Sequence, residues 1–413
     1  MKMFVGVVFA AGLMAAATRP SEAACGTQAG PCNCADLPNP IYLQVGDTQL
    51  NLMKALGRKL RDNTSKPITL VWITSGSCAN IDLMYHHIPA AGITGTMSYA
   101  PSQAEATTFT TASTPFTCTP TIAPATFPDI GNSALFNSAC TAEAPPATLS
   151  LTIGPRQGYV LAMPRGTSET SITAEEAYFL FGFGPTMLQA MSAAIMPWID
   201  EGQLWIRTDS KSTLLAWAAN ISVPPAKWHG TKLNGSPDVV NALLTSANAP
   251  AAIGILGSEV YDGLRGSLTV MAFRAFGQYA AYYPDSTATS RDKKNLRDGH
   301  YTVWSPTIWM QNTDGTNPVN ADAAYVVDMI AGHPVTPEPN FTPTVVVAGV
   351  GLVPDCAMRV QRTFEGGPLS LYKPPTSCTC RYEATVDASS CNTCSADTPC
   401  ATGVCRDGYC EEF

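Results

Sequence analysis

The sequence predicts an α/β protein whose core is a parallel β-sheet with helices packed on its faces. Two observations predict this fold class. Short apolar strands alternate with helical patterns along most of the chain, and the first strands are each followed by a polar turn that begins a helix. The chain has 413 residues, of which 45% are hydrophobic, so it can bury a large core, and its length suggests two or three domains.

The elements follow in chain order. Strands are expected at 41–45, 68–73, 158–163, 204–207, 252–256 and 268–273. Helices are expected at 50–60, 80–87, 177–183, 212–219 and 236–244, with a last one beginning at Asn320. Thr173 and Glu176 form a capping box, and Ser236 is an expected N-cap. Residues 100–128, rich in Thr, Pro, Ala and Ser, interrupt the pattern and are expected to form a long surface insertion.

The N-terminus is typical of an export signal. Lys2 precedes an apolar run over residues 3–17, and Ser21 and Ala23 frame a small-x-small cleavage site. We therefore expect residues 1–23 to be removed and the mature protein to begin at Ala24, in the periplasm or outside the cell. A lipid on Cys25 is the alternative, which the charged Glu22 disfavours.

The charge balance excludes some classes of partner. Lys and Arg number 24 against 32 Asp and Glu, which gives a formal net charge of -8. A broad electrostatic attraction to nucleic acid or to anionic lipid is not expected from this balance. A local site for a small anion remains compatible with it.

All 14 cysteines follow the signal segment, and an even number in an exported chain predicts disulfides. Eight of them lie in residues 356–413, where apolar periodicity ends, so this cysteine-rich tail is expected to be a separate unit. Zinc is the alternative, because Cys391 and Cys394 have ligand-like spacing, but thiolate sites for zinc suit reducing compartments.

Three turns share one chemical character. Residues 46–49, 75–77 and 212–213 each follow a strand and begin a helix, with Thr48, Ser75 and Ser212 supplying hydroxyl groups. Helix N-termini offer free backbone N–H groups to an anion, and ligands of open α/β sheets collect at the carboxyl ends of strands. The alternative is that these hydroxyls only cap helices.

An arginine strengthens the anion hypothesis. Arg207 ends an apolar strand, and its guanidinium could clamp an oxyanion through two parallel hydrogen bonds while Asp209 orients it. A local surface pair is the alternative.

The order of these motifs resembles that of the phosphate-binding proteins of bacterial ABC transporters, over roughly residues 40–350. The matching segments are Gly46-Asp47-Thr48, Ser75-Gly76-Ser77, Asp129-Ile130-Gly131-Asn132-Ser133, Arg207-Thr208-Asp209-Ser210-Lys211-Ser212-Thr213, Gly235-Ser236 and Ala252-Ile253-Gly254-Ile255. The cysteine-rich tail lies outside the match.

The resemblance implies a two-lobed type 2 periplasmic-binding-protein-like fold with an added disulfide-rich C-terminal segment. One lobe would comprise residues 36–155 and 266–355, the other residues 156–265, and the tail residues 356–413. It further implies that a small oxyanion such as phosphate binds between the lobes and that the partners are ABC transporter membrane subunits. The expected ligand-binding residues are Thr48, Gln49, Ser75, Gly76, Ser77, Ser133, Arg207, Asp209, Ser212 and Thr213.

The sequence also departs from the family pattern. Ala134 stands where phosphate binders carry an Asp after the Gly-x-Ser serine, Lys211 and Ser212 replace a Ser and a Gly, and Gln49 replaces an aromatic residue. Selectivity for phosphate is therefore not implied, and the oxyanion site could be altered, enlarged or lost.

No enzymatic motif accompanies these segments. The chain has no Gly-x-Ser-x-Gly elbow, no His-Glu-x-x-His and no phosphate loop, and its five histidines are scattered. We therefore predict a non-enzymatic binding protein without metal or cofactor. The alternative function is a surface or extracellular scaffold that keeps this fold and attaches to cell-surface partners through its tail.

Overall fold

The structure is a computed structural model of the chain. It describes residues 25–26, 32–86, 95–120, 127–387, 389–401 and 404–411. The expected signal peptide and His87 lie outside the described residues. Within the described ranges no helix combines the length and the apolar character that crossing a membrane requires.

The first lobe begins with two strand–helix units. Their elements are β2 (Pro40–Gly46), η2 (Asp47–Gln49), α1 (Leu50–Arg61), β3 (Thr69–Ser75) and α2 (Ser77–His86). β2 and β3 are parallel, and Gly46 at the end of one lies opposite Ser75 at the end of the other. The two polar turns that follow these strands are therefore neighbours, as the sequence predicts.

The sheet of the first lobe includes a strand from the expected insertion. Its order is β1 (Cys32–Asn33), β5 (Phe116–Thr119), β4 (Met97–Tyr99), β3, β2, β6 (Ile130–Ser133), β14 (Trp304–Asn312) and β7 (Leu149–Pro164). β5 lies within residues 100–128 and pairs with β4 and β1. The insertion interpretation is corrected for this strand, because Phe116 and Cys118 point into the core while the threonines between and after them are exposed.

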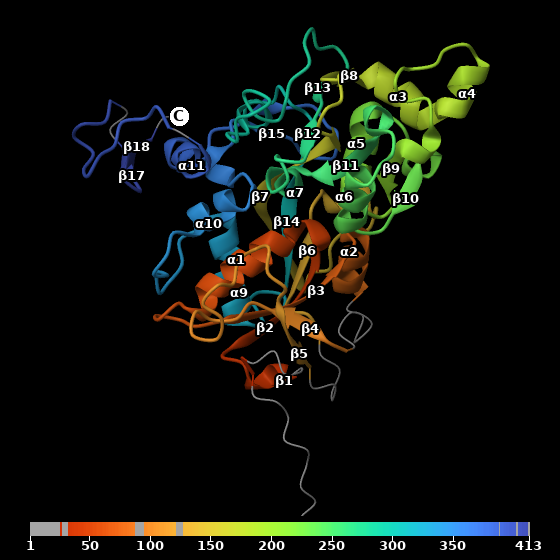
Figure 1. Cartoon of the computed structure of the whole chain (residues 1–413). Coiled ribbons are helices and arrows are strands. Elements are labelled where there is room, and N and C mark those ends of the chain that lie inside the picture. Colours follow the sequence, from red (N-terminus) through yellow and green to blue (C-terminus); the bar gives the residue numbers. More distant parts are fainter. Residues whose placement is uncertain are drawn as a thin grey trace, which may run out of the picture.

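The second lobe is also an α/β unit (Figure 1). Its strands are the end of β7, β8 (Ser171–Thr173), β9 (Leu204–Arg207), β10 (Thr231–Leu233), β11 (Ile253–Gly257), β12 (Leu268–Val270) and β13 (Ala272–Arg274). Its helices are α3 (Ala174–Phe183), α4 (Pro185–Ala190), α5 (Ser212–Ile221), α6 (Ser236–Leu244), α7 (Ser258–Asp262) and α8 (Lys294–Arg297). The capping box predicted at Thr173 and Glu176 is present at the start of α3.

Two long strands, β7 and β14, cross between the lobes (Figure 1). β7 pairs with β14 as far as Gly158 and from Tyr159 onward pairs with β11 and β12. Residues 268–303, which we expected in the first lobe, pair and pack with the second. Phe273 and Tyr301 lie in the same buried cluster as Trp217, so the chain returns to the first lobe at β14.

The remaining elements lie at the C-terminal end. They are α9 (Ala321–Ala331), α10 (Pro343–Gly349), β15 (Val360–Gln361), β16 (Ser370–Leu371), α11 (Thr379–Val386), β17 (Cys405–Arg406) and β18 (Tyr409–Cys410). Asn320 caps α9 through its side chain, as the predicted helix start requires. α9 buries Val326 and Ile330 in the core of the first lobe.

The 14 cysteines form seven disulfides. The pairs are Cys25–Cys32, Cys34–Cys118, Cys78–Cys140, Cys356–Cys378, Cys380–Cys391, Cys394–Cys405 and Cys400–Cys410. Cys391 and Cys394, whose spacing suggested zinc, are bonded to Cys380 and Cys405, so their sulfurs are not free thiolates. Disulfides in this number are typical of an oxidising compartment.

The cysteine-rich tail is only partly separate from the body. Met358 and Tyr382 are buried in the main cluster of the second lobe, and Glu383 pairs with the buried Arg297 at 2.9 Å. Composition predicted a separate unit because residues 378–413 contain few apolar side chains. The structure corrects this for residues 356–387, since these few side chains are inserted into the body. β17 and β18 project beyond α11 (Figure 1).

A truncation pair tests this boundary. Deleting residues 388–413, with Cys380→Ala to avoid a free thiol, removes Glu411, whose carboxylate accepts from the Cys380 and Arg381 N–H groups at the start of α11, and should lower the free energy of unfolding by about 1–2 kcal/mol. Deleting residues 378–413, with Cys356→Ala because its partner Cys378 is lost, also removes Tyr382, and losing a fully buried aromatic side chain costs about 3–5 kcal/mol. Urea unfolding followed by tryptophan fluorescence measures both. Equal effects of the two deletions would place the boundary elsewhere.

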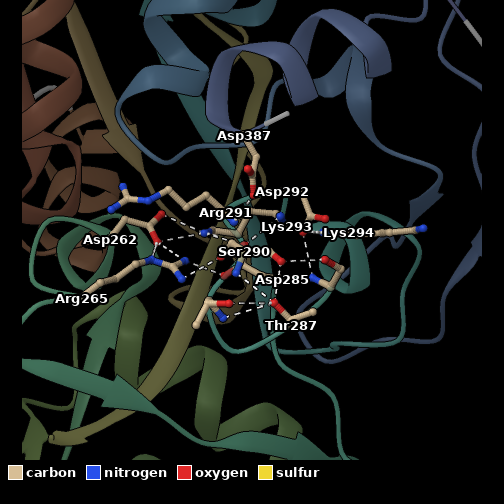
Figure 2. Close-up of polar contacts among 12 residues, drawn as sticks. Asp262, Arg265, Asp285, Thr287, Ser290, Arg291, Asp292, Lys293, Lys294 and Asp387 are labelled. Carbon is tan, nitrogen blue, oxygen red and sulfur yellow. Dashed lines mark hydrogen bonds and ion pairs between the residues drawn. The ribbon is translucent and has the colours of Figure 1, made fainter. Parts of the chain in front are cut away.

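A buried network of four charged groups ties the loop before α8 to α7 (Figure 2). The Lys293 ammonium donates to Asp262 Oδ2 at 2.8 Å and to Asp285 Oδ1 at 3.1 Å, and the Arg265 guanidinium bonds both acids at 2.6 Å. Burial alone would lower the pKa of Lys293, but the two carboxylates raise it. Two cations and two anions thus compensate each other in the interior.

Candidate functional site

A cavity of about 610 Å³ opens between the two lobes. Its first-lobe wall consists of η2, the start of α1 and the end of β3, and its second-lobe wall consists of Lys211, α6 and α7. The lining residues are Asp47, Thr48, Leu50, Asn51, Thr74, Ser75, Lys211, Asn234, Gly235, Ser236, Pro237, Val240, Asn241, Leu244, Glu259, Val260 and Gly263. The turns at Thr48 and Ser75 therefore reach one cavity, as their positions at neighbouring strand ends predict.

Lys211 is the cation that opens into this cavity. Its side chain is only 8% exposed, and its ammonium group forms no hydrogen bond or ion pair with any residue that the structure describes. Its methylene groups lie against the first lobe, where a Cβ built on Gly76 would be 3.5 Å from Lys211 Cδ. Burial lowers the pKa of Lys211, and the nearby Asp47 charge partly opposes this. An anion bound here would add a direct partner for a cation that the nearby Asp47 charge only partly compensates.

Asp47 bridges the lobes beside Lys211. Its Oδ2 accepts hydrogen bonds from Arg207 Nη2 at 2.8 Å, from the Ser236 backbone N–H at 3.1 Å and from the Ser236 hydroxyl at 3.2 Å. Burial alone would raise the pKa of Asp47, but the charges of Arg207 and Lys211 and these hydrogen bonds outweigh it and lower the pKa. The carboxylate of the first lobe thus occupies an anion position at the start of α6 in the second.

Arg207 does not face the cavity. It is fully buried, and besides Asp47 it donates to the Ser236 hydroxyl at 2.9 Å and to the backbone oxygens of Asn234 and Leu233. The anion held by Arg207 is therefore a side chain of the protein. Asp209, which we expected to orient Arg207, instead pairs with Lys232 at 2.6 Å on the surface. That expectation is corrected, because the strand end turns Asp209 outward while Arg207 points inward.

Ser236 also differs from its expected role. α6 is capped by the Asp238 carboxylate, which accepts from the Gly235 N–H at 2.9 Å, and not by Ser236. The Ser236 hydroxyl is thereby free to join Arg207 and Asp47.

Of the other expected site residues, Thr48 and Ser75 line the cavity, whereas the remaining ones are not among its lining residues: Gln49, Gly76, Ser77, Ser133, Ser212 and Thr213. Thr48 Oγ1 and Thr213 Oγ1, from the two lobes, are buried hydroxyls without a hydrogen-bond partner among the described residues. Ser77 Oγ accepts from the Ala134 N–H at 3.1 Å, and Ser133 donates to the Leu135 oxygen at 2.8 Å, so both are engaged within the protein. Ser212 lies near the hydroxyl of Tyr159, which donates to the Ala134 oxygen.

A hydrogen-bond relay connects the lobes behind the cavity. Gln49 Nε2 donates to Gln157 Oε1 at 2.6 Å, and Gln157 Nε2 donates to Glu259 Oε2 at 2.6 Å. Glu259 lines the cavity, and its Oε1 has no hydrogen-bond partner within the described residues. Burial raises the pKa of Glu259 to about 8, so this carboxyl group is protonated and neutral at pH 7.

Glu259 makes stability depend on pH. In the unfolded chain its pKa returns to the ordinary 4.5, so its contribution to stability is complete below that value and is lost as pH rises toward 8. Glu259→Gln keeps the relay without a titrating group. At pH 8.5 the variant should therefore be more stable than the parent by at least about 1.4 kcal/mol, the equivalent of one pKa unit, with a smaller difference at pH 5. Urea unfolding at both pH values measures this, and a pH-independent difference would contradict it.

Sequence reasoning missed Asp47, Lys211, Ser236 and Glu259 as site residues. The first three lie within the motif segments already noted, and Lys211 was recognised only as an added charge. Nothing in the sequence near Glu259 indicates its place at the cavity, because Gln157, its partner, is 102 residues away.

Comparison with solved structures identifies the fold. The chain is similar to a phosphate ABC transporter substrate-binding protein from Clostridium perfringens with bound phosphate, with a TM-score of 0.50 and 11% identity over 76% of this chain and 99% of that chain. The chain has the fold of a substrate-binding protein. The resemblance that the motif order predicts is thus confirmed at the level of the fold.

Other solved structures are similar at lower TM-scores. An ABC-type phosphate transport receptor from Vibrio cholerae has a TM-score of 0.46 and 10% identity over 76% of this chain and 99% of that chain. The reduced OxyR regulatory domain from Pseudomonas aeruginosa has a TM-score of 0.38 and 11% identity over 70% of this chain and 96% of that chain. No protein-family model and no curated protein matches the sequence. The ligand must therefore be argued from the site itself.

Proposed function

We propose that this protein is an exported solute-binding protein that holds a small anion, phosphate or a related oxyanion, between its two lobes. The observation that carries the proposal is Lys211, a largely buried lysine at the inter-lobe cavity whose ammonium group forms no hydrogen bond or ion pair with the described residues. Both lobes contribute to the cavity, so a ligand bound there would contact both and favour the closed arrangement.

The position of the anion differs from that expected from the sequence. Arg207 is saturated by Asp47 and by backbone oxygens, so we assign the anion to Lys211, with the Ser75 hydroxyl on the facing wall. The neutral state of Glu259 at pH 7 supports this assignment, because an ionised carboxylate there would repel the ligand. The seven disulfides support a site of action in the periplasm or outside the cell. Membrane subunits of an ABC transporter are the partners we propose.

A second candidate is a scaffold that keeps the fold without a ligand. It is favoured by one observation: Asp47 already fills the anion position at Arg207 and Ser236, which joins the lobes without any solute. In that case the tail would provide attachment to cell-surface partners.

A thermal-shift screen separates the two candidates. The disulfide-intact protein would be tested against phosphate, sulfate and methylphosphonate, with sodium chloride at matched ionic strength as the control. A ligand at 100 times its dissociation constant adds roughly 2.7 kcal/mol to the free energy of unfolding, so a binder should raise the melting temperature clearly. No shift with any anion at millimolar concentration would favour the scaffold.

A further inference from the structure

The inter-lobe cavity is much larger than an inorganic oxyanion. A water molecule's share of liquid volume is about 30 Å³, so an ion of five heavy atoms fills on the order of 100 Å³. The cavity measures about 610 Å³, which lies within the range of roughly 300–1,000 Å³ that is usual for sites of organic ligands. An inorganic anion at Lys211 would leave most of this space to water.

The lining of the cavity combines polar and apolar side chains. Thr74, Ser75 and Ser236 are among the polar lining residues. Along α6, the apolar Val240 and Leu244 follow Ser236 by about one and two helical turns. The apolar lining residues are Leu50, Pro237, Val240, Leu244 and Val260.

The packing of α6 against the second lobe explains why Val240 and Leu244 reach the cavity. Val239 and Leu243 face the core of the second lobe, where both are buried. Val240 directly follows Val239, and Leu244 directly follows Leu243. Both therefore lie on the adjacent face of α6, which lines the cavity. Leu244 remains 48% exposed although it is a large aliphatic side chain. Val240 packs partly against this core, whereas Leu244 belongs to none of the buried clusters of the described residues.

We propose that the ligand is an organic anion, with its charged group at Lys211 and a nonpolar body along Val240 and Leu244. This inference rests on the proposed function and names its ligand class. The amide groups of Asn51 and Asn241, which also line the cavity, would hydrogen-bond polar groups in the middle of such a ligand.

Calorimetric titration with two probes tests the inference. Inorganic phosphate carries only the charged group, and phenyl phosphate adds a nonpolar body. We expect phenyl phosphate to bind at least about 10-fold more tightly to the parent protein, with a more negative heat-capacity change because apolar surface is buried. Benzoate in a parallel titration distinguishes a carboxylate from a phosphate ester as the preferred charged group.

Matched variants locate the nonpolar body. Leu244→Asn should reduce the preference for phenyl phosphate over inorganic phosphate several-fold and leave the affinity for inorganic phosphate unchanged. Leu371→Asn, at a leucine that is 91% exposed outside the cavity, should change neither affinity. Lys211→Met should weaken both probes.

The outcomes separate this inference from the function on which it rests. If phenyl phosphate and benzoate bind no more tightly than inorganic phosphate, or if Leu244→Asn leaves the preference intact, the organic-anion inference fails while the anion-binding function stands. If none of the three anions binds, the proposed function fails and the inference with it.

Discussion

Replacing Lys293 by Met is expected to lower the free energy of unfolding by about 3–5 kcal/mol. The Lys293 side chain is 1% exposed and contacts Asp262 and Asp285, so its removal leaves these two carboxylates with Arg265 as their one remaining ion-pair partner among the described residues (Figure 2). An uncompensated buried charge is far more costly than the loss of an exposed pair.

The neighbouring lysine is a matched control for this substitution. Lys294→Met removes an exposed ammonium at the first residue of α8 and should change stability by less than about 0.5 kcal/mol. Urea unfolding followed by circular dichroism compares the two variants. If both have the same small effect, the four charged groups do not form the compensated network described above.

Replacing Arg207 by Ala should destabilise the protein by a similar amount, about 3–5 kcal/mol. Arg207 is fully buried, and its loss leaves the Asp47 carboxylate with the two Ser236 donors as hydrogen-bond partners among the described residues and with Lys211 as the remaining nearby cation. The pair spans 160 residues and both lobes, so the variant should also open the cleft. Urea unfolding gives the first quantity, and small-angle X-ray scattering should show a larger radius of gyration.

A surface pair and a pH series complete this test. Arg274→Ala breaks an exposed pair with Glu175 and should change stability by less than about 1 kcal/mol.

Because the pKa of Asp47 is lowered on folding, its stabilising contribution exists above its ordinary pKa and is lost as pH falls through the lowered value. Asp47→Asn should therefore be less stable than the parent at pH 7, and the difference should shrink under acidic conditions. If Arg207→Ala leaves stability unchanged but abolishes anion binding, Arg207 is the oxyanion clamp that the sequence suggested.

The elements of the fold could be predicted because their signals are local. The face of α1, the capping box before α3 and the N-cap of α9 depend on residues within a few positions of one another. The resemblance of the motif order to that of the phosphate-binding proteins then implied the two-lobed fold. The path of residues 268–303 was not predictable in this way, since Phe273 and Tyr301 reach a core formed by distant helices.

The candidate site was predicted in its location but not in its chemistry. Thr48 and Ser75 reach the cavity because parallel strands end at one edge of the sheet. The pairing of Arg207 with Asp47 depends on how the lobes close. The sequence around Arg207 does not contain this partner, so it does not show whether the guanidinium binds a solute or the Asp47 carboxylate. The position of Tyr382 in the tail was not predictable for the same reason. Its neighbours in the sequence are polar, and the apolar residues that bury it belong to the second lobe.

Titration of inorganic phosphate into the parent protein and into Lys211→Met tests the central claim most directly. A hydrogen bond to a charged group contributes about 1.5–3 kcal/mol, so the substitution should weaken binding roughly 10- to 100-fold. Lys227→Met, at an exposed lysine of the second lobe, should bind phosphate as the parent does. Saturable binding that is lost with Lys211 and kept in the control is the predicted result. Equal affinity of all three proteins, or no binding to the parent, would contradict the assignment of the anion to Lys211.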